Sequence, residues 1–142
     1  MSGFHPSVCI DAVFEGKSFE DACRAVSEAG LPAIEFWGWW DKDLEALQEA
    51  REKYDLALSA CCTKFVSLVD PETRAAYLEG LAASIETARS LGTRTLISQV
   101  GDFRPGVPRE AQRITVHARS AAGWRTPLPA LRTGSVCRHE WD

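Results

Sequence analysis

The feature that most constrains the fold is a regular alternation of short apolar runs and longer amphipathic segments. Four runs of five to seven residues begin about 23 to 38 residues apart, and they have the length and residue types of strands. Each gap is long enough for a helical crossover, which is the connection that joins parallel strands. The sequence therefore predicts a parallel sheet covered by helices, with strands at Ser7–Val13, Ala33–Trp37, Leu56–Cys62 and Arg94–Val100.

The segments between the runs carry helix start and stop signals. Ser18 precedes apolar residues at positions 19, 22, 23 and 26, which share one helix face, and Gly30 follows them. Asp70 is followed by a proline, the residue favoured at the first helical position. The sequence predicts helices that begin after Ser18, after Asp41 or Asp43, after Asp70 and at Pro108.

Two architectures share this order of elements, the doubly wound sheet and the TIM barrel. A doubly wound nucleotide-binding sheet usually has a glycine-rich phosphate loop after its first strand. Residues 14–18 contain Gly-Lys-Ser but neither the dinucleotide fingerprint nor the complete P-loop pattern. The triplet therefore favours a turn followed by an N-cap.

Charge and cysteine content narrow the class of protein. The 142 residues suit one domain, and a net charge of −4 provides no positive field for nucleic acid or an anionic membrane. No apolar stretch is long enough to span a membrane and residues 1–6 do not resemble a signal peptide, so we expect a cytoplasmic protein. The five cysteines have no C-x-x-C spacing, which favours buried reduced thiols.

The composition changes after residue 113. Residues 1–113 carry a net charge of −6, whereas residues 114–142 contain four arginines, no lysine and two acids, giving +2. No helical or strand period continues through the two prolines of this stretch. We interpret 1–113 as the folded domain and 114–142 as an irregular, disordered tail, and an out-of-frame reading of a GC-rich gene is our hypothesis for its origin.

The apolar runs and their flanks resemble the xylose isomerase-like family of TIM barrels, which includes hydroxypyruvate isomerase. The resemblance rests on Ala29–Trp37, which contains Ile-Glu-Phe-Trp, on Ala88–Leu96, which contains Leu-Gly-Thr, and on Gly101. It implies a partial (β/α)8 barrel with about four parallel strands and three to four helices, the N-terminal half of the complete fold.

The same resemblance implies a chemistry. In the family, a proton moves between the carbons that flank a carbonyl, through an enediolate on a divalent metal such as Mg²⁺ or Mn²⁺. The family's catalytic carboxylates and metal ligands come mainly from strands five to eight. We therefore assign no catalytic residue and no metal ligand to this chain.

Substrate-contacting residues are expected at the carboxyl ends of the strands. Side chains alternate along a strand, so we expect Glu35 and Trp37 of the second strand to share a face that lines the barrel mouth. Gln99 on the fourth strand and Asp11 on the first could bind sugar hydroxyls. Two alternatives stay open: Glu35 could instead pair with a lysine or arginine inside the barrel, and Trp39 and Trp40 could serve packing or the rim.

Three functions follow as hypotheses. The first is an isomerase or epimerase acting on a sugar or a hydroxy-keto acid such as hydroxypyruvate, truncated and lacking its main carboxylates. The second is a non-catalytic half-barrel that binds a small molecule or protein and forms a homo-oligomer through its open sheet edge. The third is an inactive truncated product.

Overall fold

The computed structural model of the chain describes residues 5–125, with only the backbone described for 118–125. Its centre is a parallel four-stranded sheet in the order β1-β2-β3-β4. A doubly wound sheet reverses its strand order at a switch point, whereas a barrel wall adds its strands in sequence. The partial TIM-barrel prediction is therefore confirmed, with strands β1 (Ser7–Cys9), β2 (Ala33–Phe36), β3 (Ala57–Cys62) and β4 (Leu96–Ile97).

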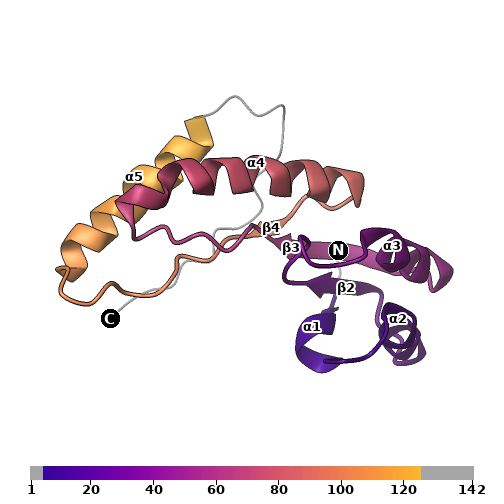
Figure 1. Cartoon of the computed structure of the whole chain (residues 1–142). Coiled ribbons are helices and arrows are strands. Elements are labelled where there is room, and N and C mark those ends of the chain that lie inside the picture. The colour runs from indigo at the N-terminus through magenta and orange to yellow at the C-terminus, as the bar shows by residue number, and fades with distance from the viewer. Residues whose placement is uncertain (1–4, 126–142) are drawn as a thin grey trace.

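Helices occupy the connections between the strands (Figure 1). The predicted caps form: the Ser18 hydroxyl accepts the Asp21 backbone N–H at 3.1 Å, and the Asp43 carboxylate accepts that of Ala46 at 3.0 Å. Gly30 has a φ of +73°, the left-handed conformation that ends a helix. The helical elements are α1 (Ile10–Val13), α2 (Phe19–Glu28), α3 (Leu44–Lys53), the 3₁₀ turn η1 (Pro71–Thr73), α4 (Arg74–Ser90) and α5 (Arg109–Arg125).

Two strand predictions were too long. The first strand ends at Cys9, and the next four residues form α1 instead of continuing to Val13. This turn brings Asp11 to the backbone N–H of Trp37, so a tertiary contact overrides the apolar pattern. The fourth strand has two residues rather than seven, because β4 pairs with β3 alone and only over Leu96 and Ile97.

The hydrophobic core lies between the sheet and its helices. Ile34 and Phe36 of β2 are fully buried against this layer, whereas Glu35 between them is half-buried on the opposite side of the strand. The core also takes in residues from α2, α3 and α4, so these helices cover one face of the sheet. Its main members are Ala22, Cys23, Val26, Leu47, Ala50, Leu58, Cys61 and Ala88.

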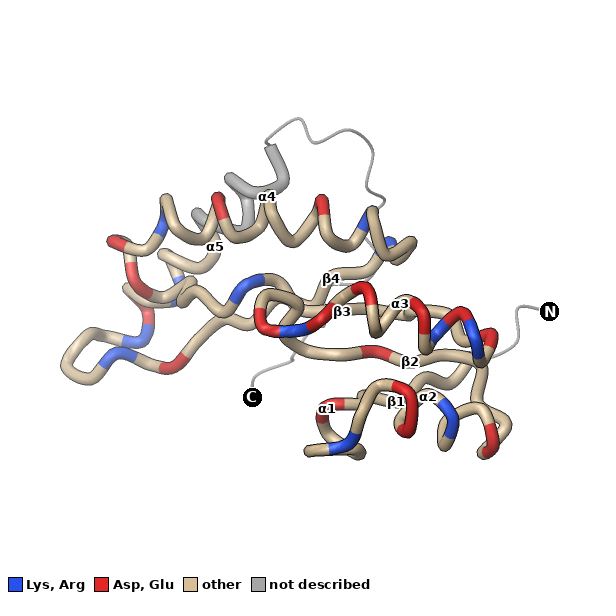
Figure 2. Tube along the Cα trace, turned by 45° about the vertical axis from the view of Figure 1, so that its right-hand side comes forward, with Lys and Arg blue, Asp and Glu red and all other residues tan. Residues whose placement is uncertain are grey.

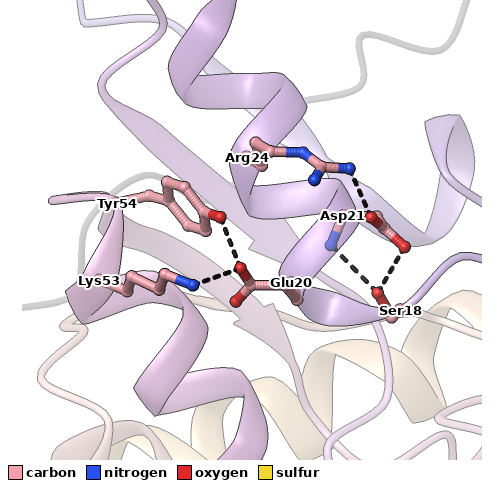
Figure 3. A network of polar contacts seen from close by, with 6 residues as sticks. All are labelled: Ser18, Glu20, Asp21, Arg24, Lys53 and Tyr54. Carbon is pink, nitrogen blue, oxygen red and sulfur yellow. Dashed lines mark hydrogen bonds and ion pairs between the residues drawn. The ribbon is translucent and has the colours of Figure 1, made fainter.

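A polar network fastens α2 to α3 at the outer surface (Figure 3). The Glu20 carboxylate accepts hydrogen bonds from Lys53 at 2.6 Å and from the Tyr54 hydroxyl at 2.5 Å. These contacts hold the pKa of Glu20 below its ordinary value, and they raise the pKa of Lys53. The network therefore adds polar contacts between two helices that the core already holds together.

The last described helix crosses the expected domain boundary at residue 113. Its start follows the prediction at Pro108, but α5 continues as a helix to Arg125. The buried Gln112 side chain anchors it, accepting the Arg104 N–H at 2.8 Å and donating to the Val107 carbonyl at 2.8 Å. Residues 126–142 lie outside the described residues, so the tail hypothesis stays a prediction.

Candidate functional site

An open cleft of about 480 Å³ lies at the carboxyl ends of the first three strands. This is the end of a parallel barrel at which ligands bind. A second hollow lies between the outer helices α2 and α3, away from the strand ends. The residues of the cleft come from α1 and the turn after it, from the loop between β2 and α3, and from the loop after β3. They are Asp11, Ala12, Glu15, Trp37, Gly38, Trp40, Asp41, Lys42 and Phe65.

The charged centre of the cleft is an ion pair between Asp11 and Lys42. One carboxylate oxygen of Asp11 lies 3.0 Å from Lys42 Nζ, and the other accepts the Trp37 backbone N–H at 2.6 Å. The two side chains are only 20% and 14% exposed, so solvent screens the pair weakly. Asp11 therefore connects the end of β1 to the loop that follows β2, and it sets the shape of the cleft floor.

Aromatic rings form one wall of the cleft. Trp40 packs edge-on against Phe65 at a centroid distance of 4.8 Å, and Trp39 packs against Trp40 at 5.8 Å. Trp37 and Phe65 are each 48% exposed, so ring area remains accessible to a ligand. Rings with one free face are suited to the apolar C–H face of a sugar or to another flat molecule.

The structure brings together two of the four predicted contact residues. Asp11 and Trp37 line the cleft, whereas Glu35 and Gln99 do not. Strand β2 ends at Phe36, so the alternation that would place Glu35 and Trp37 on one face stops before Trp37. Gln99 is exposed two residues beyond the end of β4, and within residues 5–117 Glu35 makes no ion pair with a lysine or arginine.

Trp39 and Trp40 have different roles. Trp39 is half-buried against the hydrophobic core, which agrees with the packing alternative. Trp40 lines the cleft.

Sequence reasoning missed Lys42 and Phe65. Lys42 lies two residues after Trp40 in the loop that follows β2, and a lysine so close to the tryptophan run is the signal that could have identified it. Phe65 lies three residues after β3 in a segment with no regular pattern. Both enter the site through contacts with distant segments, since Lys42 pairs with Asp11 and Phe65 with Trp40.

Two cysteines lie near the cleft but stay protonated. Burial raises the pKa of Cys62 to about 11, and Cys9, Glu35 and Asp11 add to the rise. Burial also raises the pKa of Cys9. Since the thiolate is the nucleophile and the metal ligand, these groups behave as small hydrophobes, as the sequence predicts.

The described residues do not fit a divalent metal. No group of three or more His, Cys, Asp or Glu side chains in this part of the chain could hold one. Asp11 is engaged by an ammonium and a backbone N–H, and Lys42 would repel a cation placed beside it. The described residues therefore supply no metal-dependent step of a reaction.

Surface charge is mixed rather than segregated. Helices α3 and α4 each carry both basic and acidic residues (Figure 2). Three acids and one lysine line the cleft, so its formal charge is negative. None of the described helices has the length and hydropathy needed to cross a lipid bilayer.

The four-stranded sheet and the cleft at its carboxyl edge define an open portion of a TIM barrel. Among solved structures, an AP endonuclease, family 2, from Brucella melitensis matches with a TM-score of 0.71 and 17% identity, over 82% of this chain and 48% of that one. A protein from Sinorhizobium meliloti 1021 matches with a TM-score of 0.61 and 19% identity, over 84% and 48%. No family model matches, and no curated protein matches.

These likenesses agree with the partial TIM-barrel fold expected from the sequence, and at 17% and 19% identity they show the fold alone. The chain spans about half the length of the matched structures. The activity of a complete barrel is therefore not assigned by the comparison.

Proposed function

We propose that this chain forms one wall of a sugar-binding site in an isomerase- or epimerase-like TIM barrel. The observation that carries the proposal is the cleft itself, which is lined both by the Asp11–Lys42 pair and by the exposed rings of Trp37 and Phe65. Polar groups and flat rings together suit a ligand with hydroxyls on its edge and C–H groups on its faces. The family that the sequence resembles takes its catalytic carboxylates mainly from strands five to eight, so we assign none of the cleft carboxylates to proton transfer.

The cleft charge favours a neutral polyhydroxylated carbonyl compound over hydroxypyruvate or a phosphorylated sugar. Asp11, Glu15 and Asp41 exceed the single charge of Lys42, so an anionic ligand is repelled. Lys42 has three N–H donors and shares its charge with Asp11 at 3.0 Å and Asp41 at 3.7 Å. A remaining donor can bind a hydroxyl or carbonyl oxygen, while Asp11 holds the ammonium in place.

Binding can be tested on the full chain by following tryptophan fluorescence and ¹H–¹⁵N spectra during titration with a neutral ketose, a neutral aldose or hydroxypyruvate, each with and without Mg²⁺ or Mn²⁺. We expect the neutral sugars to perturb the signals of Trp37 more than hydroxypyruvate does.

Phe65→Ala should weaken sugar binding about 3- to 10-fold through loss of ring contact. The matched control is Phe103→Ala, since Phe103 is also exposed but does not line the cleft. Tighter binding of hydroxypyruvate than of either sugar would contradict the charge argument.

A nucleic-acid substrate is less well supported, although one structural neighbour is an AP endonuclease. The cleft is negative, and the basic and acidic positions along the chain are mixed (Figure 2), so the described residues provide no basic track for phosphates. Salt-dependent binding of a duplex containing an abasic site would favour that function instead.

A binding module that pairs with a second copy is the other candidate. On the described residues β4 pairs only with β3, and the apolar side chains of Ile97, Val100 and Phe103 nearby are exposed. Sedimentation velocity tests this candidate: a dimer that dissociates in an Ile97→Lys variant would support it, whereas a monomer at all concentrations would exclude it.

The cytoplasmic location expected from the sequence also remains a proposal. It is supported by the four described cysteines, all of which are unpaired, as is usual in a reducing compartment.

A further inference from the structure

Ser84 connects the two loops that form the aromatic wall of the cleft. It lies on α4, is 0% exposed, and its hydroxyl oxygen accepts the Trp39 indole N–H at 3.0 Å and the Lys64 backbone N–H at 3.1 Å. The same hydroxyl donates to the Gly80 carbonyl one turn earlier at 2.6 Å. One buried hydroxyl thus binds the β2–α3 loop, the β3–α4 loop and its own helix.

Each loop contact lies beside a ring of the wall. Trp39 packs against Trp40 at 5.8 Å, and Lys64 immediately precedes Phe65, whose ring packs against Trp40 at 4.8 Å. The geometry between Trp40 and Phe65 therefore depends on two loops that share an anchor on α4. The pairing of β2 with β3 ends at Phe36 and Cys61, before either ring is reached.

A second observation shows how closely α4 approaches the β3–α4 loop. At Gly80, an added Cβ would lie 3.0 Å from the Lys64 Cβ, a separation tighter than ordinary packing. The helix backbone thus lies directly against the loop, and Ser84 follows one turn later with its hydrogen bond to the same residue. The close approach of Gly80 and the hydrogen bond to Ser84 together hold Lys64 in one position.

We infer that Ser84 is a positioning residue of the cleft, which sets the Trp40–Phe65 wall by holding Trp39 and Lys64. It contacts no ligand itself, since it does not line the cleft. Its consequence for sugar affinity rests on the proposed function, whereas its effect on the rings does not.

The primary test is Ser84→Ala in the full chain, compared with Ser90→Ala. Ser90 is the matched control because it lies on the same helix and donates to a helix carbonyl, Thr87, but is exposed and contacts neither loop. In ¹H–¹⁵N spectra, Ser84→Ala should shift the indole N–H of Trp39, the amide of Lys64 and the indole N–H of Trp40. The control should leave all three signals at their wild-type positions.

Trp39→Phe provides a second variant that keeps an aromatic ring and removes only one of the two loop contacts. It should shift the Trp40 indole signal while leaving the Lys64 amide hydrogen bond in place. For a sugar that binds the wild-type chain, Ser84→Ala should weaken the affinity about 3- to 10-fold. This is the fold-change that corresponds to the net contribution of about one hydrogen bond. In the Trp39→Phe background that loss should be smaller, because one of the contacts is already gone.

The outcomes separate this inference from the proposed function. If the wild-type chain binds no sugar, the proposed function fails, but the indole and amide signals still test the role of Ser84. If Ser84→Ala leaves the Trp40 indole and Lys64 amide at wild-type positions, the positioning role is refuted. Movement of those signals without any change in the affinity of a sugar that does bind would also refute it.

Discussion

Replacement of Asp11 by asparagine removes the charge at the cleft floor and preserves the shape of the side chain. Asparagine keeps an oxygen that can accept the Trp37 N–H, so the main loss is the ion pair with Lys42. Two unit charges 3.0 Å apart attract by about 5.5 kcal/mol at an effective dielectric constant of about 20, and desolvation offsets most of this. A hydrogen bond to a charged group contributes about 1.5–3 kcal/mol net.

We therefore expect Asp11→Asn to lower the free energy of unfolding by about 2 kcal/mol. The entropy of unfolding of a chain of 142 residues is about 0.3 kcal/mol per kelvin, so this corresponds to a fall in Tm of about 7 °C. Urea and thermal unfolding measure both quantities. The matched control is Asp41→Asn, because Asp41 lies 3.7 Å from the same ammonium but is 66% exposed, and we expect a change within about 0.5 kcal/mol.

A double-mutant cycle with Lys42→Met isolates the pair. The double variant should lose at least about 1 kcal/mol less of its free energy of unfolding than the sum of the two single losses. Once Asp11 is neutral, Lys42→Met removes a charge that no longer has its partner. A coupling free energy within about 0.3 kcal/mol of zero would show that the pair does not stabilise the cleft floor. Equal effects of Asp11→Asn and Asp41→Asn would refute the argument from burial.

Three further predictions concern other parts of the fold. At pH 8 iodoacetamide should modify the partly exposed Cys9 before Cys62, which is buried and has a pKa of about 11, and mass spectrometry of the native chain checks the order. Gly101→Ala should lower the free energy of unfolding in urea by about 1–3 kcal/mol, because φ is +92° there and an added Cβ would lie 2.9 Å from the Ser67 hydroxyl oxygen. Stability contributed by Glu20 should be present above its unfolded-state pKa and be lost as pH falls through its lower folded-state pKa, whereas that from Lys53 should be lost at alkaline pH. Glu20→Gln should therefore remove part of the acid dependence of urea unfolding below pH 4.5, and an unchanged profile would show that the network has no effect on stability.

Local signals located most of the secondary structure. The cap at Ser18 and the turn at Gly30 depend on hydrogen bonds and backbone angles within a few residues, so they can be recognised without knowing the fold. The same holds for Asp43 at the start of α3. The shortened β1 is different, because the chain turns into α1 where Asp11 meets Trp37, 26 residues away.

Two of the four contact residues predicted from the sequence lie in the cleft. Trp37 was predicted because it ends an apolar run, where a parallel sheet gathers its ligand-binding groups. Asp11 was predicted as the one acid within the first run, and it reaches the cleft because that strand ends at Cys9. Gln99 was predicted by the same reasoning as Trp37, but β4 ends at Ile97 and leaves it exposed. Strand ends are set by pairing with the neighbouring strand, and that information is not local.

The sequence by itself determined the order of the four strands and of the longer helices, the parallel class of the sheet and the caps that start α2 and α3, because these depend on periodicity and on short-range hydrogen bonds. Only the tertiary structure decided that Lys42 pairs with Asp11, that Phe65 packs on Trp40, and that Ser84 holds both aromatic loops. Those contacts join residues 20 to 45 positions apart, and the register of the sheet and the docking of α4 bring them together.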